Sequence, residues 1–171
     1  MSAELELQRI YDEHADGVFA FLLNFTRNED DTRDLLQEIF VRLARQPGIL
    51  RPARNERAFL IGLAHHAAID LMRRRGAREK YHQRFGAEAV SVFAGTGDAD
   101  QLEFRAAVSE ALGDLPPEQR AVVHLKLWEY LTFEEIAEAL AIPPNTAASR
   151  YRYGLDKLRE RLRLLYAEIK S

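Results

Sequence analysis

The 171-residue sequence contains no cysteine and no long apolar run, and each absence narrows the class of protein. Without cysteine, disulfide frameworks, thiolate metal sites and cysteine nucleophiles are excluded. The longest purely apolar stretches span a few residues, and the N-terminus reads MSAELEL, which is acidic rather than basic. We therefore expect no membrane span and no secretory signal, and we expect a cytoplasmic protein.

Glycine and proline are also scarce, with 9 and 6 residues, so the chain is neither collagen-like nor of low complexity. Hydrophobic residues make up 47% of the sequence and charged residues 30%, which is enough apolar content for a buried core. The length predicts one or two domains of roughly 100 to 200 residues each.

The net charge of -3 is small, but the two signs are segregated along the chain. Residues 1–48 and 87–114 are mainly acidic, whereas residues 49–84 carry nine basic and three acidic residues. Residues 145–163 are basic as well, with six basic and two acidic residues. Two basic segments separated by an acidic one are typical of a two-point grip on a polyanion, although charge blocks also occur on ordinary solvated helices.

Hydrophobic periodicity predicts helices in nearly every segment, so the expected fold class is all-α. The first helix covers roughly residues 3–25, a second follows Asn28 as its N-cap, and a third runs from about residue 56 through Arg75. Further helices are expected near 102–113, from Pro116 to about 129, and from Thr132, which forms a capping box with Glu135. Residues 86–100 (GAEAVSVFAGTGDAD) have no sustained period and predict a flexible linker.

Residues 131–162 have the spacing of a helix-turn-helix, with a break between Ala141 and Pro144. In such a motif the second helix enters the major groove of DNA, so it needs small or hydrogen-bonding residues near its start and cations around them. Thr146, Ser149, Arg150 and Tyr153 share one face of this helix. The basic residues around that face include Arg152 and Lys157.

The third predicted helix ends in a dense basic run. Arg73, Arg74 and Arg75 are followed by Arg78, Lys80 and Arg84, which exceeds what the helix dipole alone would favour. Such a run suits a phosphate track, and nearby aromatic residues could stack on unpaired bases. Phe59, one of these aromatic residues, fits the core better than a base-stacking role.

Three ordered blocks carry a family resemblance: DLLQEIFVRLAR at 34–45, FLIGLAHHAAIDLMRRR at 59–75, and residues 115–162 beginning LPPEQRAVVHLKLWEYLTFEEIAEAL. They resemble the successive conserved blocks of bacterial group 4 sigma factors, the extracytoplasmic-function (ECF) type of the sigma-70 family. The resemblance implies two helical domains joined by a flexible linker, with the helix-turn-helix in the C-terminal domain. It also implies no catalytic site, no cofactor and no metal, and it gives core RNA polymerase and promoter DNA as partners. Many members are held by an anti-sigma factor, which is therefore a candidate partner here.

The resemblance assigns residues 1–85 to polymerase binding and to recognition and melting of the minus-ten promoter element. Residues 86–100 are then the linker, and residues 101–171 read the minus-35 element. The candidate contacts are Asp34, Gln37 and Glu38 for polymerase; Arg51, Asn55, His66, Asp70, Arg73, Arg74 and Arg75 for the minus-ten element; and Thr146, Ser149, Arg150, Arg152, Tyr153 and Lys157 for the minus-35 element.

The sequence departs from the family pattern at His66, where Asn is usual, and at Ala141, where Gly is usual. Ala147 and Ala148 replace a common Val and Lys, so the base preferences are not fixed by the resemblance. One alternative is a stand-alone helix-turn-helix regulator that binds duplex DNA as a homodimer. A metalloenzyme using His65, His66 and Asp70 is disfavoured because no third ligand has a compatible spacing and the neighbours are cationic. The remaining histidines, His14, His82 and His124, read as surface or core-edge residues.

Overall fold

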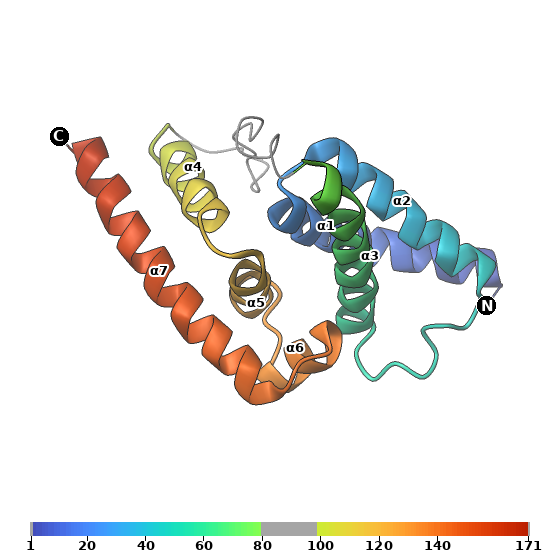
Figure 1. Cartoon of the computed structure of the whole chain (residues 1–171). Coiled ribbons are helices and arrows are strands. Elements are labelled where there is room, and N and C mark those ends of the chain that lie inside the picture. The colour runs from blue at the N-terminus through green and yellow to red at the C-terminus, as the bar shows by residue number, and fades with distance from the viewer. Residues whose placement is uncertain (1, 80–98, 171) are drawn as a thin grey trace.

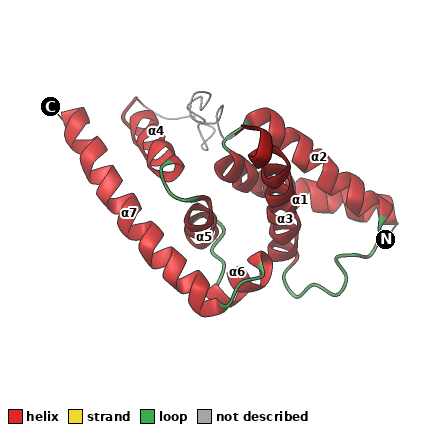
Figure 2. Cartoon of the chain, in the orientation of Figure 1, coloured by secondary structure: helices red, strands yellow, loops and turns green. Residues whose placement is uncertain are grey.

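A computed structural model describes residues 2–79 and 99–170, and within these ranges every regular element is a helix (Figure 2). The expectation of an all-α fold is therefore confirmed. The helices are α1 (Ala3–Thr26), α2 (Glu29–Arg45), α3 (Glu56–Glu79), α4 (Ala99–Gly113), α5 (Pro117–Leu127), α6 (Phe133–Leu140) and α7 (Pro144–Lys170). Among them, none combines the length and apolarity that a bilayer crossing requires.

Local hydrogen bonds set where the N-terminal helices begin and end. Arg27, in the left-handed conformation with φ 58°, ends α1, and its N–H bonds the Leu23 carbonyl. Asn28 then caps α2, as predicted, by accepting a hydrogen bond from the Asp31 N–H at 2.9 Å. The apolar stripe of α2, with Leu35, Ile39 and Leu43, is buried against the core, so the opposite side of this helix faces outward.

The capping box predicted from the sequence is present at the start of α6. Thr132 Oγ1 accepts from the Glu135 N–H at 3.1 Å, and the Glu135 carboxylate accepts from the Thr132 N–H at 3.0 Å. The backbone hydrogen bond from Thr132 lowers the pKa of Glu135, so this carboxylate stays charged. Ala141 makes the turn of the helix-turn-helix in a left-handed conformation, with φ 56°. The long helix α7 follows directly from Pro144.

The main hydrophobic core is shared by the N-terminal and C-terminal helices. One cluster of buried residues contains Phe21 and Ile61 from α1 and α3 together with Val122, Leu125 and Ile136 from α5 and α6. Helix α1 contacts α5, and α3 contacts α6, so α5 lies between α7 and the N-terminal helices (Figure 1). A second cluster joins α4, α5 and α7 around Leu112, Val123 and Leu158. The chain therefore folds here as two halves in direct contact.

Two sequence expectations need adjustment. His124, expected at the surface or the core edge, is 2% exposed and lies deep between α1 and α5, because its ring is covered by Phe21 and Trp128. The helix expected near 102–113 begins earlier, at Ala99, so residues 99 and 100 of the expected linker belong to α4. The rest of that linker lies outside the described residues.

Candidate polymerase and promoter interfaces

The outward face of α2 presents the candidate polymerase contacts together. Asp34, Gln37 and Glu38 are all exposed, and they line one shallow surface with Val41 and Arg42. Asp34 and Glu38 stand one helical turn apart on the side opposite the buried stripe. Val41, which is 40% exposed, adds apolar area to this otherwise polar surface.

The C-terminal part of α3 carries exposed cations, as the sequence predicts. Arg73 and Arg74 are exposed, and so is Asp70, whose backbone oxygen accepts a hydrogen bond from Arg74 Nε at 3.4 Å. Arg75 is different, because its guanidinium pairs with the carboxylate of Asp31 on α2. Among Arg73, Arg74 and Arg75, the first two are thus exposed without a carboxylate partner on α2.

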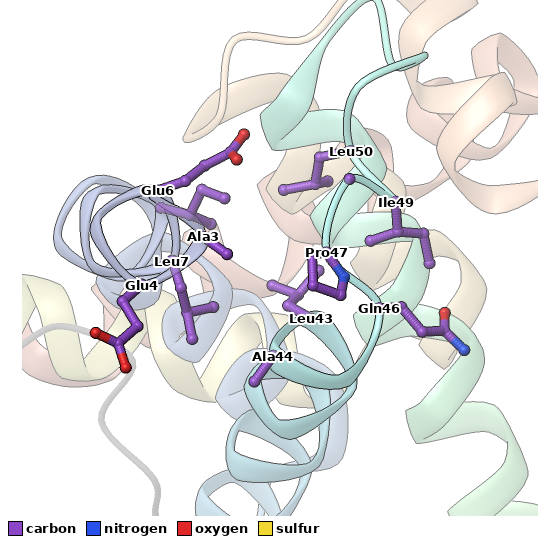
Figure 3. Close-up of a pocket in the computed structure, with 12 residues that line it drawn as sticks. Ala3, Glu4, Glu6, Leu7, Leu43, Ala44, Gln46, Pro47, Ile49 and Leu50 are labelled. Carbon is purple, nitrogen blue, oxygen red and sulfur yellow. The ribbon is translucent and has the colours of Figure 1, made fainter. Parts of the chain in front are cut away.

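The loop between α2 and α3 separates an apolar side from a polar side. Its residues Ile49 and Leu50 face a hollow of about 350 Å³ between the start of α1 and the end of α2, together with Leu7 (Figure 3). Glu4 and Glu6 stand at the rim of this hollow, and their negative charge opposes a nucleic acid there. Arg51, by contrast, is exposed in the middle of the loop.

Asn55 and His66 are held by local hydrogen bonds. Asn55 caps α3, since its Oδ1 accepts from the Ala58 N–H at 3.0 Å, and its Nδ2 donates to the Glu135 carboxylate of α6. His66 is exposed, and its Nδ1 donates to the Gly62 carbonyl oxygen at 2.7 Å. In this structure, Asn55 is therefore engaged by the C-terminal half, whereas His66 is accessible.

The face of α7 that carries the candidate minus-35 contacts is only partly exposed to solvent. Tyr153 is 55% exposed, and the Arg152 guanidinium lies over its ring at 5.2 Å; Lys157 is exposed too. Thr146, Ser149 and Arg150, nearer the start of the helix, are half-buried. They share one side of the helix, as the spacing predicts, but their first turn lies close to the N-terminal half.

The pKa of His65 on α3 reflects this proximity. Burial, followed by the charges of His66 and Arg150, lowers the pKa of His65 to about 4. The His65 ring packs against Phe25 with centroids 5.3 Å apart, so the imidazole is neutral and held in an apolar setting. Arg150 of α7 is thus near enough to His65 of α3 for its charge to contribute to this shift.

Comparison with known proteins identifies both halves of the chain. Residues 10–78 match the family model described as sigma-70 region 2, and residues 111–160 match the model of sigma-70 region 4. The chain is 32% identical over 167 residues to the RNA polymerase sigma factor CarQ of Myxococcus xanthus, covering 98% of this chain and 95% of that protein. The chain belongs to the sigma-70 family, as a sigma factor of ECF type.

Two further matches agree with this membership. The ECF sigma factor SigX of Bacillus subtilis is 26% identical, with 97% of this chain and 88% of that protein covered. A solved structure, the sigma factor RpoE of Bartonella quintana in complex with the anti-sigma factor NepR, superposes with a TM-score of 0.76 over 92% of this chain and 97% of that one. At 19% identity, this likeness shows the fold alone.

As a sigma factor, the protein binds core RNA polymerase and directs promoter recognition, DNA opening and transcription initiation. The region 2 match decides against the stand-alone regulator, because the helix-turn-helix alone would fit both. Sigma factors are not enzymes. Among the described residues, the histidine and carboxylate groups close enough to share a metal are Glu13, His14 and Glu56, and Arg9 already bonds both Glu56 oxygens at 3.1 Å.

Three polar residues buried between the two halves are not among those predicted from the sequence to be functional. Asn24, Arg120 and His124 are 1%, 6% and 2% exposed. A usable signal existed at Arg120, because it lies on α5 among the apolar residues Ala121, Val122 and Val123, where a charged side chain needs dedicated partners.

Proposed function

We propose that the sigma factor divides its work between residues 1–85, which bind polymerase and the minus-ten element, and residues 101–171, which read the minus-35 element, with 86–100 as the linker. The observation that carries this division is the difference in chemistry between the two DNA faces. The α3 face joins the exposed cations Arg73 and Arg74 to Asp70 and His66. The α7 face offers the hydroxyls of Thr146 and Ser149 beside Arg150, a set suited to base edges in a major groove.

On this proposal, Arg51, Asn55 and Arg75 complete the minus-ten surface. Asn55 and Arg75 would exchange their present partners, Glu135 and Asp31, for DNA. Arg152, Tyr153 and Lys157 extend the α7 face along the groove and its phosphates. Asp34, Gln37 and Glu38 bind basic residues of polymerase, and their loss costs affinity because complementary charges are removed from an interface.

The proposal includes a cytoplasmic site of action, no catalytic activity of its own and no cofactor. An anti-sigma factor is a proposed partner, because the structural neighbour was solved in complex with one. The faces such a partner would cover are those assigned above to polymerase and promoter.

One transcription experiment with three variants tests the division. Open-complex formation is measured on promoters with single-base changes in each element, at two salt concentrations. Arg150→Ala should cost about 1 to 3 kcal/mol at one or two minus-35 base pairs, as a lost base-edge contact does. Replacing Arg73 and Arg74 by alanine should weaken opening on all promoters and flatten the salt dependence, as lost phosphate contacts do.

The third variant, Asp34→Lys with Glu38→Lys, should weaken binding of core polymerase while circular dichroism shows unchanged helicity, because exposed carboxylates contribute little to folding. Unchanged polymerase affinity would remove these residues from the interface. If Arg150→Ala weakens all promoters equally and the Arg73 and Arg74 pair changes only minus-35 preference, the division between the halves is wrong.

A further inference from the structure

The loop between α2 and α3, residues 46–55, carries Arg51 and Asn55 of the proposed minus-ten surface, and its first part has a fixed shape. Leu50 is buried and faces the hollow between α1 and α2 (Figure 3). Three backbone hydrogen bonds, at 3.2, 3.1 and 3.0 Å, each join residues three positions apart and fold residues 46–53 into consecutive turns. The first part of the loop is therefore held by apolar contact and by its own backbone.

The end of the loop is held differently, by an ion pair between α1 and the first residue of α3. Arg9 of α1 donates from Nη1 and Nη2 to the two carboxylate oxygens of Glu56, each at 3.1 Å. Such a bidentate pair fixes the relative orientation of two planar groups as well as their distance. Because 47 positions separate the partners, the pair joins two helices rather than stabilising one.

His14, also on α1, holds the same carboxylate from a more buried position. Its side chain is 11% exposed, and its Nε2 donates to Glu56 Oε1 at 2.9 Å. The hydrogen bond from Arg9 is the main cause that lowers the pKa of Glu56, so the carboxylate stays charged and accepts from both donors. We call Arg9, His14 and Glu56 the α1 anchor.

The α1 anchor acts on the end of the loop because the loop is continuous with the first turn of α3. The Asn55 side chain accepts from the Ala58 N–H and its carbonyl oxygen accepts from the Phe59 N–H, both at 3.0 Å. A shift of the start of α3 therefore moves Asn55, together with the exposed Arg54 before it. Groups that recognise a ligand need to be held to within about 0.5 Å of their productive geometry.

We propose that Arg9 is a positioning residue for minus-ten recognition, which acts through Glu56 to hold Asn55 and the loop in the geometry that distinguishes one base from another. The inference rests on the proposed assignment of Arg51 and Asn55 to the minus-ten element. A loop already in its binding shape loses less conformational freedom when it binds. For the backbone of one residue, that loss is equivalent to about a five- to thirtyfold change in an equilibrium constant.

The test compares Glu56→Gln with Glu13→Gln in the full chain. Both carboxylates accept a hydrogen bond from Arg9, and the bond to Glu13, at 3.0 Å, stays within α1. Each variant removes one negative charge, so the attraction of the protein to DNA changes by the same charge in both. Only Glu56→Gln weakens the connection between α1 and α3, which makes Glu13→Gln the matched control.

Open-complex formation with core polymerase is measured on promoters with single-base changes in each element, and discrimination is the ratio of rates on the preferred and the altered promoter. Glu56→Gln and Arg9→Gln should each lower minus-ten discrimination at least about fivefold, the lower end of the ordering cost. Glu13→Gln should leave it unchanged, and discrimination at the minus-35 element should be unchanged in all three variants.

Two further measurements separate positioning from a general loss of structure. The variant that combines Arg9→Gln with Glu56→Gln should lose no more discrimination than either single variant, because both changes remove the same contact. Polymerase affinity and the urea midpoint should stay close to those of the wild type, because the pair is partly exposed, with 36% and 30% of the two side chains accessible.

Four results would overturn the inference: unchanged minus-ten discrimination in Glu56→Gln, an equal loss in Glu13→Gln, a loss in Arg9→Gln alone, or an equal loss at both promoter elements. The third would show that Arg9 contacts DNA itself, and the fourth that the variant is generally destabilised. Failure of the proposed function is separate, because Arg51→Ala and Asn55→Ala would then leave minus-ten discrimination unchanged. If the inference alone fails, those two variants lower discrimination and Glu56→Gln does not.

Discussion

His124 should make the contact between the halves sensitive to acid. Its ring is buried between Phe21 and Trp128, and burial lowers its pKa to about 4, against an ordinary value of 6.5. Nδ1 accepts a hydrogen bond from the Asn24 amide, which requires this nitrogen to be unprotonated, and Nε2 is buried without a hydrogen-bond partner. A proton on Nδ1 would make this nitrogen a donor facing the Asn24 amide, which is also a donor, and would place a positive charge in an apolar setting.

The size of the effect follows from linkage. A histidine whose pKa is lowered by folding binds its proton more readily in the unfolded chain, so stability is complete above pH 6.5 and falls as the pH drops toward 4. Between about pH 7 and about pH 5, the free energy of unfolding should fall by about 1.8 kcal/mol through His124 alone. His65, whose pKa burial also lowers to about 4, adds a loss of the same sign.

Urea unfolding of the wild type and of His124→Gln, monitored by the fluorescence of Trp128, measures the contribution of His124 to the free energy of unfolding. Trp128 is the single tryptophan of the chain, and its ring stacks on His124 with centroids 5.6 Å apart. Glutamine cannot titrate, but its amide oxygen can accept the bond from Asn24. The pH-dependent loss should be about 1.8 kcal/mol smaller in the variant, while His65 and the carboxylates cancel in the comparison.

The comparison of the wild type with His124→Gln also cancels the pH-dependent contribution of Glu129. Burial raises the pKa of Glu129, so it binds its proton more readily in the folded chain and its own contribution favours folding as the pH falls, opposite to His124. Equal losses in the wild type and His124→Gln over this pH interval would show that His124 is not buried in neutral form, and the described contact between α1 and α5 would then be wrong.

Two further predictions concern single backbone and side-chain features. Ala141→Gly should raise the free energy of unfolding, measured in urea, by roughly 0.5 to 1 kcal/mol. The left-handed conformation costs alanine about 1 to 2 kcal/mol, and the greater flexibility of glycine in the unfolded chain cancels part of that gain. A loss of stability would contradict this prediction. Arg120→Lys should lower the free energy of unfolding by at least about 2 kcal/mol in the same assay, since one ammonium cannot reach the carbonyls of two helix ends, and a neutral result would contradict the buried geometry.

Local features could be predicted from the sequence because their causes are local. The capping box at Thr132 and Glu135, the Asn28 cap and the buried stripe of α2 depend on residues three or four positions apart, and all three occur. The turn at Ala141 also falls where the pattern breaks, between two helices. These elements place the outward face of α2 and the basic end of α3 without any knowledge of the rest of the chain.

The buried polar contacts between the halves could not be predicted, because their partners are distant in the sequence. Asn24 and His124 are 100 positions apart, and Arg120 finds its acceptors at the ends of helices whose relative placement no periodicity encodes. The half-buried start of α7 has the same origin: helical spacing gives Thr146, Ser149 and Arg150 a common side but does not say what lies opposite. Both depend on the packing of the halves, which is set by the shared core.

The contact between the halves combines an apolar core with one buried charge. Phe21, Ile61 and Val122 stabilise the contact by apolar burial, which contributes about 25 cal/mol for each Å² removed from water. Arg120 contributes differently, because the hydrogen bonds of its guanidinium go to neutral carbonyl groups and the loss of hydration of its charge offsets part of their gain. The arginine therefore fixes one packing of the halves while adding less stability than an apolar side chain of similar size would add.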